Sequence, residues 1–177
     1  MTETTTELAT EIATEIATEI ESTDRPNPEL PIATASYTEC LNHYALLFSK
    51  LSPTNVAALG PLVSETIYFT DPFNRLKGKA NFLGLMSEMF EQLNDVGFEV
   101  LETQIQGQTG YLYWRFSASS SLTGSFSTEG TSRVCFNHQG LVISHQDFWD
   151  ASVLIEQFPL LGRLIRYIRK RGAYQAK

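Results

Sequence analysis

The feature that most constrains the fold is a series of four strand-like segments in the second half of the chain. They span residues 97–106, 110–119, about 125–136 and 141–149. Three short turn sequences, each containing glycine, separate them at residues 107–110, 122–124 and 137–140. Strands joined by such turns are typical of antiparallel hairpins. The pattern therefore predicts a continuous antiparallel meander.

Helical segments precede this meander. Apolar residues recur with a helical period from Tyr37 to Leu51, Thr54 is a suitable cap for a short helix ending at Leu62, and a third helix follows Gly78. A short strand at residues 67–73 is closed by Asp71 and the proline after it. Helices followed by a meander predict an α+β fold. A long twisted sheet with helices on one face curls around them, so the concave side is expected to hold a ligand cavity.

Charge and periodicity together divide the chain into three parts. The first 29 residues carry eight acidic residues and one basic residue, which accounts for the whole net charge of −7. Residues 8–20 repeat every four residues, and three prolines follow in the linker. We predict a disordered acidic tail and linker at 1–36, a pocket domain at 37–150 and a basic helical extension at 151–177 that is kinked or broken near Pro159.

Composition limits the classes of function. Cys40 and Cys135 are the only cysteines of the sequence. Two cysteines form neither a disulfide framework nor a metal-ligand spacing, so we expect reduced thiols in a cytoplasmic protein. No phosphate loop or dinucleotide fingerprint occurs, so we expect no cofactor and no metal. Beyond residue 29 acidic and basic residues balance, which argues against nucleic-acid binding.

The C-terminal segment at residues 160–171 is amphipathic and basic. Leucine and isoleucine line one side of the expected helix and arginine the other. Such a helix suits peripheral contact with an anionic membrane surface. Packing on the domain or on a dimer partner, with a solvated basic face, is the alternative.

Strand alternation groups the polar residues of the last two hairpins. His145, Asp147 and Trp149 fall on one face of their strand, where a histidine and a carboxylate two residues apart can tune one another. On the strand at 110–119, either Arg115 faces the cavity, where it would bind an anionic group, or Trp114 and Phe116 do, as an apolar wall. The sequence leaves this choice open.

Residues 37–150 resemble the ketosteroid isomerase and SnoaL-like branch of the nuclear transport factor 2 superfamily. Three sequences carry the resemblance: HYALLF at 43–48, ETIYFTDPFNRLKGKANFLGLMSEMF at 65–90, and CFNHQGLVISHQDFWDA at 135–151. The resemblance implies a cone-shaped, curved antiparallel sheet wrapped around the N-terminal helices. It also implies a homodimer, because the exposed sheet face of this superfamily commonly packs against a second copy.

The resemblance also assigns site residues. Asp71 matches the base that moves the proton in the isomerases, and Tyr44 matches the tyrosine that donates to the oxyanion. Ser132 stands where the isomerases have a protonated aspartic acid, so the steroid isomerase reaction itself does not follow. On the last strand, SnoaL-like cyclases carry a polar acid–base residue, which supports a role for His145 and Asp147.

The leading hypothesis is therefore acid–base catalysis on a small apolar or lipid-like molecule, of isomerase, cyclase or hydrolase type. Asp71, His145, Asp147 and Tyr44 would be catalytic, and the expected substrate-binding residues are Trp114, Arg115, Phe116, Ser132, Trp149 and Phe90. A non-catalytic ligand-binding protein and a dimeric interaction module of the same fold are the alternatives.

Overall fold

A computed structural model describes residues 36–158 and 160–174. The predicted acidic tail and its linker lie outside the described residues, apart from Ser36. All described residues belong to one compact unit, which begins at Ile32.

The elements follow the predicted order, with one additional strand. The helices before and within the domain are α2 (Tyr37–Ser49), the 3-10 helix η1 (Val56–Leu62) and α3 (Lys79–Gln92). The strands are β1 (Val63–Thr70), β2 (Arg75–Lys77), β3 (Asn94–Gln106), β4 (Thr109–Ser120), β5 (Gly124–Phe136) and β6 (Val142–Trp149). Two helices, α4 (Ser152–Ile155) and α5 (Leu161–Gly172), complete it. The sequence analysis did not predict β2, because three residues carry no measurable periodicity.

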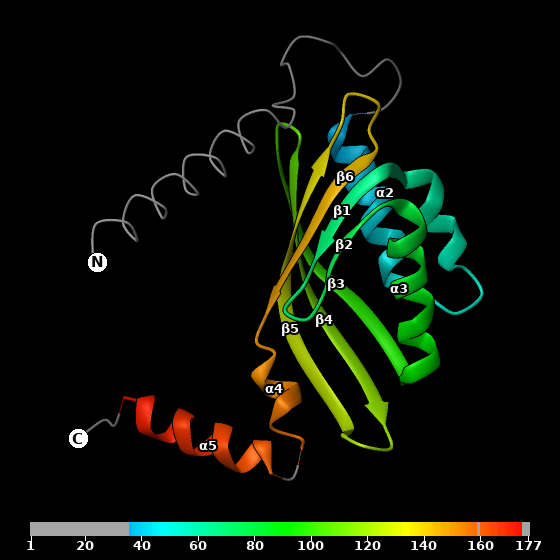
Figure 1. Ribbon diagram of the computed structural model, residues 1–177. Coiled ribbons are helices and arrows are strands. Elements are labelled where there is room, and N and C mark those ends of the chain that lie inside the picture. Colours follow the sequence, from blue (N-terminus) through cyan, green and yellow to red (C-terminus); the bar gives the residue numbers. More distant parts are fainter. Residues whose placement is uncertain (1–35, 159, 175–177) are drawn as a thin grey trace, which may run out of the picture. The chain divides into compact units, whose positions relative to one another are not determined.

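The six strands form one sheet in the order β2-β1-β6-β5-β4-β3. The four strands of the predicted meander, β3 to β6, are antiparallel neighbours, as the turn sequences indicated. β1 lies beside β6 in a parallel pair, with Phe69 opposite His145. This pairing joins segments more than seventy residues apart, and no local sequence pattern predicts it. The sheet is thus mixed, and it curves with helices on one face (Figure 1).

Local sequence explains where α2 begins and which face it buries. The Ser36 hydroxyl accepts from the backbone N–H of Glu39, and the Glu39 carboxylate accepts from the Ser36 N–H at 2.7 Å, which forms a capping box. From this start, Leu41, Tyr44 and Phe48 recur at helical spacing and are all buried. The cap therefore fixes the register that carries Tyr44 into the core.

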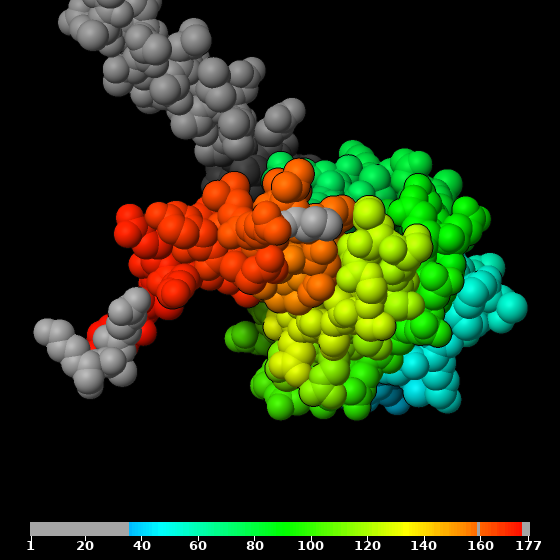
Figure 2. All heavy atoms as spheres, turned by 90° about the horizontal axis from the view of Figure 1, so that it is seen from below, coloured from blue at the N-terminus to red at the C-terminus, as the bar shows by residue number. Residues whose placement is uncertain are grey.

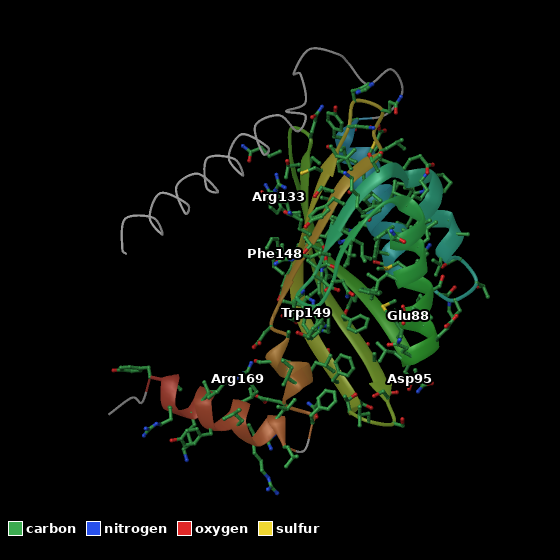
Figure 3. All side chains as sticks on the ribbon, in the orientation of Figure 1. Glu88, Asp95, Arg133, Phe148, Trp149 and Arg169 are labelled. Carbon is green, nitrogen blue, oxygen red and sulfur yellow. The ribbon has the colours of Figure 1, made fainter. Side chains whose placement is uncertain are left out.

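The core lies between the concave face of the sheet and helices α2 and α3. Large side chains that are almost completely buried come from both layers: Leu41, Tyr44, Ile67, Phe69, Phe82, Val134 and Phe136. On the opposite face of the sheet, Arg133 and Phe148 point away from these helices (Figure 3). Phe148 is 60% exposed, as expected for the alternate parity of β6.

The described part of the extension after β6 contains two helices. Helix α4 ends at Ile155 and α5 begins at Leu161, while residue 159 lies outside the description. Neither these helices nor any other helix of the described chain has the length and apolar content needed to cross a membrane.

Candidate active site

Two polar side chains of β6 lie on the concave face of the sheet. His145 and Asp147 point to the same side of the sheet because strand residues two apart share a face. His145 is buried, with 3% of its side chain exposed, and Asp147 is partly open, with 19% exposed. Trp149, the next residue of this parity, lies at the end of β6 beside α4 (Figure 3).

A chain of hydrogen bonds links α2 to β6. The Tyr44 hydroxyl lies 2.8 Å from His145 Nδ1, and His145 Nε2 lies 2.8 Å from Asp147 Oδ1. Burial, with the Asp147 charge adding to it, raises the pKa of Tyr44, so the phenol keeps its proton and donates to Nδ1. A carboxylate oxygen can only accept, so His145 Nε2 is the donor to Asp147 Oδ1.

A second chain reaches the same carboxylate oxygen from β5 and β4. Trp114 Nε1 donates to Ser132 Oγ at 2.8 Å, and Ser132 Oγ donates to Asp147 Oδ1 at 2.5 Å. Ser132 and Asp147 are direct partners in the β5–β6 ladder. The acid that the family resemblance led us to expect at position 132 is therefore found one strand away, hydrogen-bonded to the serine that replaces it.

The two oxygens of Asp147 differ in their surroundings. Oδ1 receives both hydrogen bonds, one from His145 and one from Ser132. Within residues 36–158 and 160–174, no residue donates a hydrogen bond to Oδ2. This oxygen is not completely buried. Asp147 is thus oriented through one oxygen and accessible through the other.

Two adjacent cavities meet at Asp147. The inner cavity, about 30 Å³ in volume, is lined by Tyr44, His145 and Ser132 among others, and has room for about two water molecules. The outer cavity measures about 400 Å³, within the range of small-molecule sites. Four residues line both cavities: Met86, Phe98, Trp114 and Asp147. The carboxylate of Asp147 therefore lies between a small inner cavity, where His145 and Ser132 are its polar neighbours, and a larger outer cavity.

Aromatic side chains surround the inner end of this system. Their ring centroids lie 5.3–6.2 Å from that of His145, and they belong to Phe69, Phe48, Tyr44 and Phe82. Such apolar walls lower the local dielectric and so strengthen the hydrogen bonds that the imidazole makes. His145 is consequently held in one orientation and has no direct access to the outer cavity.

We expect the buried Tyr44 phenol to make stability depend on alkaline pH. Burial raises its pKa in the folded state above the ordinary value of about 10, so the unfolded chain loses this proton first. Below about pH 10 the ionisation of Tyr44 makes the free energy of unfolding neither rise nor fall with pH. Above about pH 10 the free energy of unfolding falls as the pH rises. Urea denaturation of wild type and Tyr44→Phe, at neutral and alkaline pH, measures the difference. An equal alkaline loss in both proteins would contradict the assignment.

Comparison with known families shows which family the chain belongs to. The family model of the SnoaL-like domain matches residues 45–145, which is more than half of the sequence. The chain belongs to the SnoaL-like domain family. No curated protein matches it.

Solved structures similar to this SnoaL-like domain share its fold at low identity. A Catenulispora acidiphila protein with a ketosteroid isomerase-like fold, solved with trimethylamine, is 16% identical with a TM-score of 0.60, over 68% of this chain and 94% of that one. A putative SnoaL-like polyketide cyclase from Jannaschia is 10% identical with a TM-score of 0.57, over 66% and 92%. An LEH-like epoxide hydrolase from M. tuberculosis is 12% identical with a TM-score of 0.54, over 75% and 95%. These likenesses confirm the predicted superfamily fold.

In this SnoaL-like domain, Asp71 closes a turn. Its Oδ1 accepts from the backbone N–H groups of Phe73 and Asn74 at 2.7 and 2.6 Å, and the Asn74 side chain donates to both carboxylate oxygens. Asp71 lines the outer cavity but not the inner one. The structure therefore brings Asp71 and Asp147 to one cavity, while the hydrogen bonds of Asp71 are those of a turn residue.

Two other predicted site residues lie away from the cavities. Arg115 is on the opposite face of β4 from Trp114, where it forms ion pairs with Glu99 and Glu129 at 2.9 and 2.8 Å. The parity left open by the sequence is thus the one that makes Trp114 and Phe116 the apolar wall, and Arg115 is excluded from ligand contact. Phe90 packs against the core and lines neither cavity. The residues of α3 that line the outer cavity are Leu85, Met86, Glu88, Met89 and Gln92, and Phe90 points to a different side of the helix.

Tyr44 occupies a different place from the one predicted. Its hydroxyl is bonded to His145 and its side chain is 1% exposed, so it does not face a ligand in the outer cavity. The remaining predicted ligand contacts, Trp114, Phe116 and Trp149, line the outer cavity, and Ser132 lines the inner one. Phe98, Phe126 and Thr128 also line the outer cavity, and the sequence analysis did not select them. Alternation along β3 and β5 was their only signal.

Over the part of the chain that the structure describes, no three His, Cys, Asp or Glu side chains converge as metal ligands would. The polar groups gathered at Asp147 are those of proton transfer: a carboxylate, an imidazole, a phenol and a serine hydroxyl.

Proposed function

We propose that this SnoaL-like domain is an acid–base enzyme acting on a small apolar molecule, with Asp147 as the group that removes and returns a proton. The observation that carries the proposal is the asymmetry of its carboxylate. Oδ1 is fixed by Ser132 and His145, Oδ2 receives no hydrogen bond from the described residues, and Asp147 lines the 400 Å³ cavity. A base held in one orientation beside an apolar ligand is what proton abstraction requires.

His145 and Tyr44 serve as positioning residues in this proposal. They form a buried line behind Asp147, with distances of 2.8 Å at each link. Because neither lines the outer cavity, they act on the ligand only through the carboxylate. Their hydrogen bonds fix which lone pairs of Asp147 remain for the ligand, much as an outer shell orients a metal ligand.

The chemistry follows from the walls of the outer cavity. Twelve of its 18 lining residues are apolar, and seven of these are phenylalanine or tryptophan, so the proposed ligand class is an apolar, ring-sized molecule. Asp147 Oδ2 would take a carbon-bound proton, and the electron pair would move onto an electronegative atom of the ligand. Thr128 also lines this cavity, and its hydroxyl makes only a long 3.4 Å bond to the Glu129 carbonyl, so it is available to donate to that atom.

A probe that needs only a general base tests the proposal. Nitrobenzisoxazole loses one carbon-bound proton to the base, its N–O bond breaks, and a coloured cyanophenolate is released. We expect saturable release that exceeds, by at least about 10²-fold, the release caused by the same concentration of acetate. A linear, unsaturable rate equal to that of acetate would contradict the proposal.

Non-catalytic ligand binding is the second candidate, favoured by the volume and apolar lining of the outer cavity. Saturable binding of the probe without faster release would support it. Native mass spectrometry of the purified protein would then show a co-purified apolar molecule, and the proposed chemistry would be abandoned.

A further inference from the structure

Helix α5 presents its apolar side to solvent. Leu161, Leu164 and Ile168 fall on one face because they are three and four residues apart, and each is more than half exposed. Tyr167 flanks them and is 59% exposed. Figure 2 shows α5, coloured orange to red, standing out from the rest of the domain. An amphipathic helix ordinarily buries such a stripe on its own domain, and this one does not.

The opposite side of α5 attaches it to the domain. A side chain at Gly162 would come within 2.1 Å of the Glu156 carbonyl oxygen, so the backbones meet there as only glycine permits. Arg169 forms ion pairs with Asp150 and, at 3.0 Å, with Glu156, and Arg166 donates to the Glu156 carbonyl at 3.1 Å. Packing on the domain, the alternative left open by the sequence, therefore uses the polar side and leaves the apolar side exposed.

The charge of this segment indicates what covers that side. Residues 157–177 contain six basic residues and no acidic residue. Among the described residues, Arg163, Lys170 and Arg171 form no ion pair with another side chain. Pairing two copies of α5 would bring like charges together, which is unfavourable. An apolar stripe bordered by cations complements a surface that is apolar inside and anionic outside.

We propose that α5 docks the protein on an anionic lipid bilayer, with Leu161, Leu164 and Ile168 entering the acyl boundary. Arg163, Lys170 and Arg171 lie at the headgroups, and Tyr167 sits at the interface, where aromatic residues with a polar tip are favoured. Each cation near such a surface contributes about 1 kcal/mol of binding free energy. The proposal is independent of the chemistry assigned to Asp147.

Vesicle flotation of the full chain tests the proposal. We expect binding to vesicles of phosphatidylcholine with phosphatidylserine, little binding to phosphatidylcholine alone, and weakening as salt is raised. Arg163→Gln with Lys170→Gln should reduce the affinity about 30-fold, which is about 2 kcal/mol at about 1 kcal/mol per cation. The matched control is Lys50→Gln with Arg75→Gln, which removes one lysine and one arginine exposed outside α5 and should leave the affinity unchanged.

The apolar stripe is tested separately. Leu164→Gln with Ile168→Gln leaves the charge unchanged and should abolish binding, while circular dichroism shows the fold retained because both residues are exposed. The proposal would be overturned if Lys50→Gln with Arg75→Gln lowered the affinity for vesicles as much as Arg163→Gln with Lys170→Gln does. Equal binding to both vesicle types would also overturn it. The proposal would also be overturned if the protein bound to neither vesicle type and sedimentation showed a dimer that Leu164→Gln dissociates.

Discussion

Replacement of Asp147 by asparagine is expected to lower the rate of proton removal from nitrobenzisoxazole by about 10²–10⁴-fold, the usual contribution of a general base. The amide oxygen can still accept from Ser132 and His145, as Oδ1 does in the wild type at 2.5 and 2.8 Å. The side chain therefore keeps its orientation but loses the lone pair that takes the proton. Steady-state release of the coloured product measures the change, and urea denaturation verifies that the fold persists.

Asp95→Asn is the matched control for this substitution. Asp95 also accepts a hydrogen bond from a serine on a neighbouring strand, Ser119, at 2.8 Å, but it lies outside both cavities. Its backbone φ of 52° suits asparagine as well as aspartate. We expect the control to keep the wild-type rate. If Asp71→Asn abolished the rate and Asp147→Asn did not, the base would be Asp71 and the assignment proposed above would be wrong.

Gly130→Ala is expected to lower the free energy of unfolding by about 1–3 kcal/mol, the cost of overpacking a close-packed core. Gly130 lies on β5 between Trp114 of β4 and Trp149 of β6. A methyl group there would lie 2.5 Å from Trp114 Cη2 and 2.8 Å from Trp149 Cβ, which is closer than non-bonded carbon atoms approach one another. Because Trp114 must move, its 2.8 Å bond to Ser132 is lost as well. Urea denaturation followed by tryptophan fluorescence measures both effects.

Gly84→Ala provides the control of opposite sign. Gly84 lies within α3, and nothing lies within 4 Å of the place its methyl group would take. Alanine in a helix interior is favoured over glycine by about 0.5–1 kcal/mol, so this variant should be slightly more stable than the wild type. A Gly130→Ala protein as stable as wild type, with unchanged tryptophan fluorescence, would show that the two indoles are not held as the structure has them.

The sequence predicted most of the fold because its signals are local. Helical spacing located α2 and α3, and the glycine-containing turns located the hairpins from β3 to β6. Alternation along β6 correctly grouped His145, Asp147 and Trp149 on one face. The same rule left Arg115 undecided, because a strand with aromatic residues on both faces has no clear inward side.

The contacts that assemble the candidate site are not local. The hydrogen bond from Ser132 to Asp147 depends on the register between β5 and β6, and that from Tyr44 to His145 joins residues 101 positions apart. Asp71 shows the converse, since the Asp-Pro pair that marked it as a candidate is accounted for by a turn with Asn74. Sequence alone gave the residue types, and the folded sheet decides which of them meet.

The parallel pairing of β1 with β6 has a consequence for how the protein is made. During synthesis β1 emerges more than seventy residues before its neighbour, so its inner edge has no partner until the last strand leaves the ribosome. Pairing over such a separation is slow, and an open strand edge is a template for other chains. Asp147, the proposed base, and His145, which positions it, lie on that late strand, so the candidate site and the final closure of the sheet are acquired in one step. A nascent chain stopped before residue 142 therefore lacks both the last strand of the core and the carboxylate of Asp147.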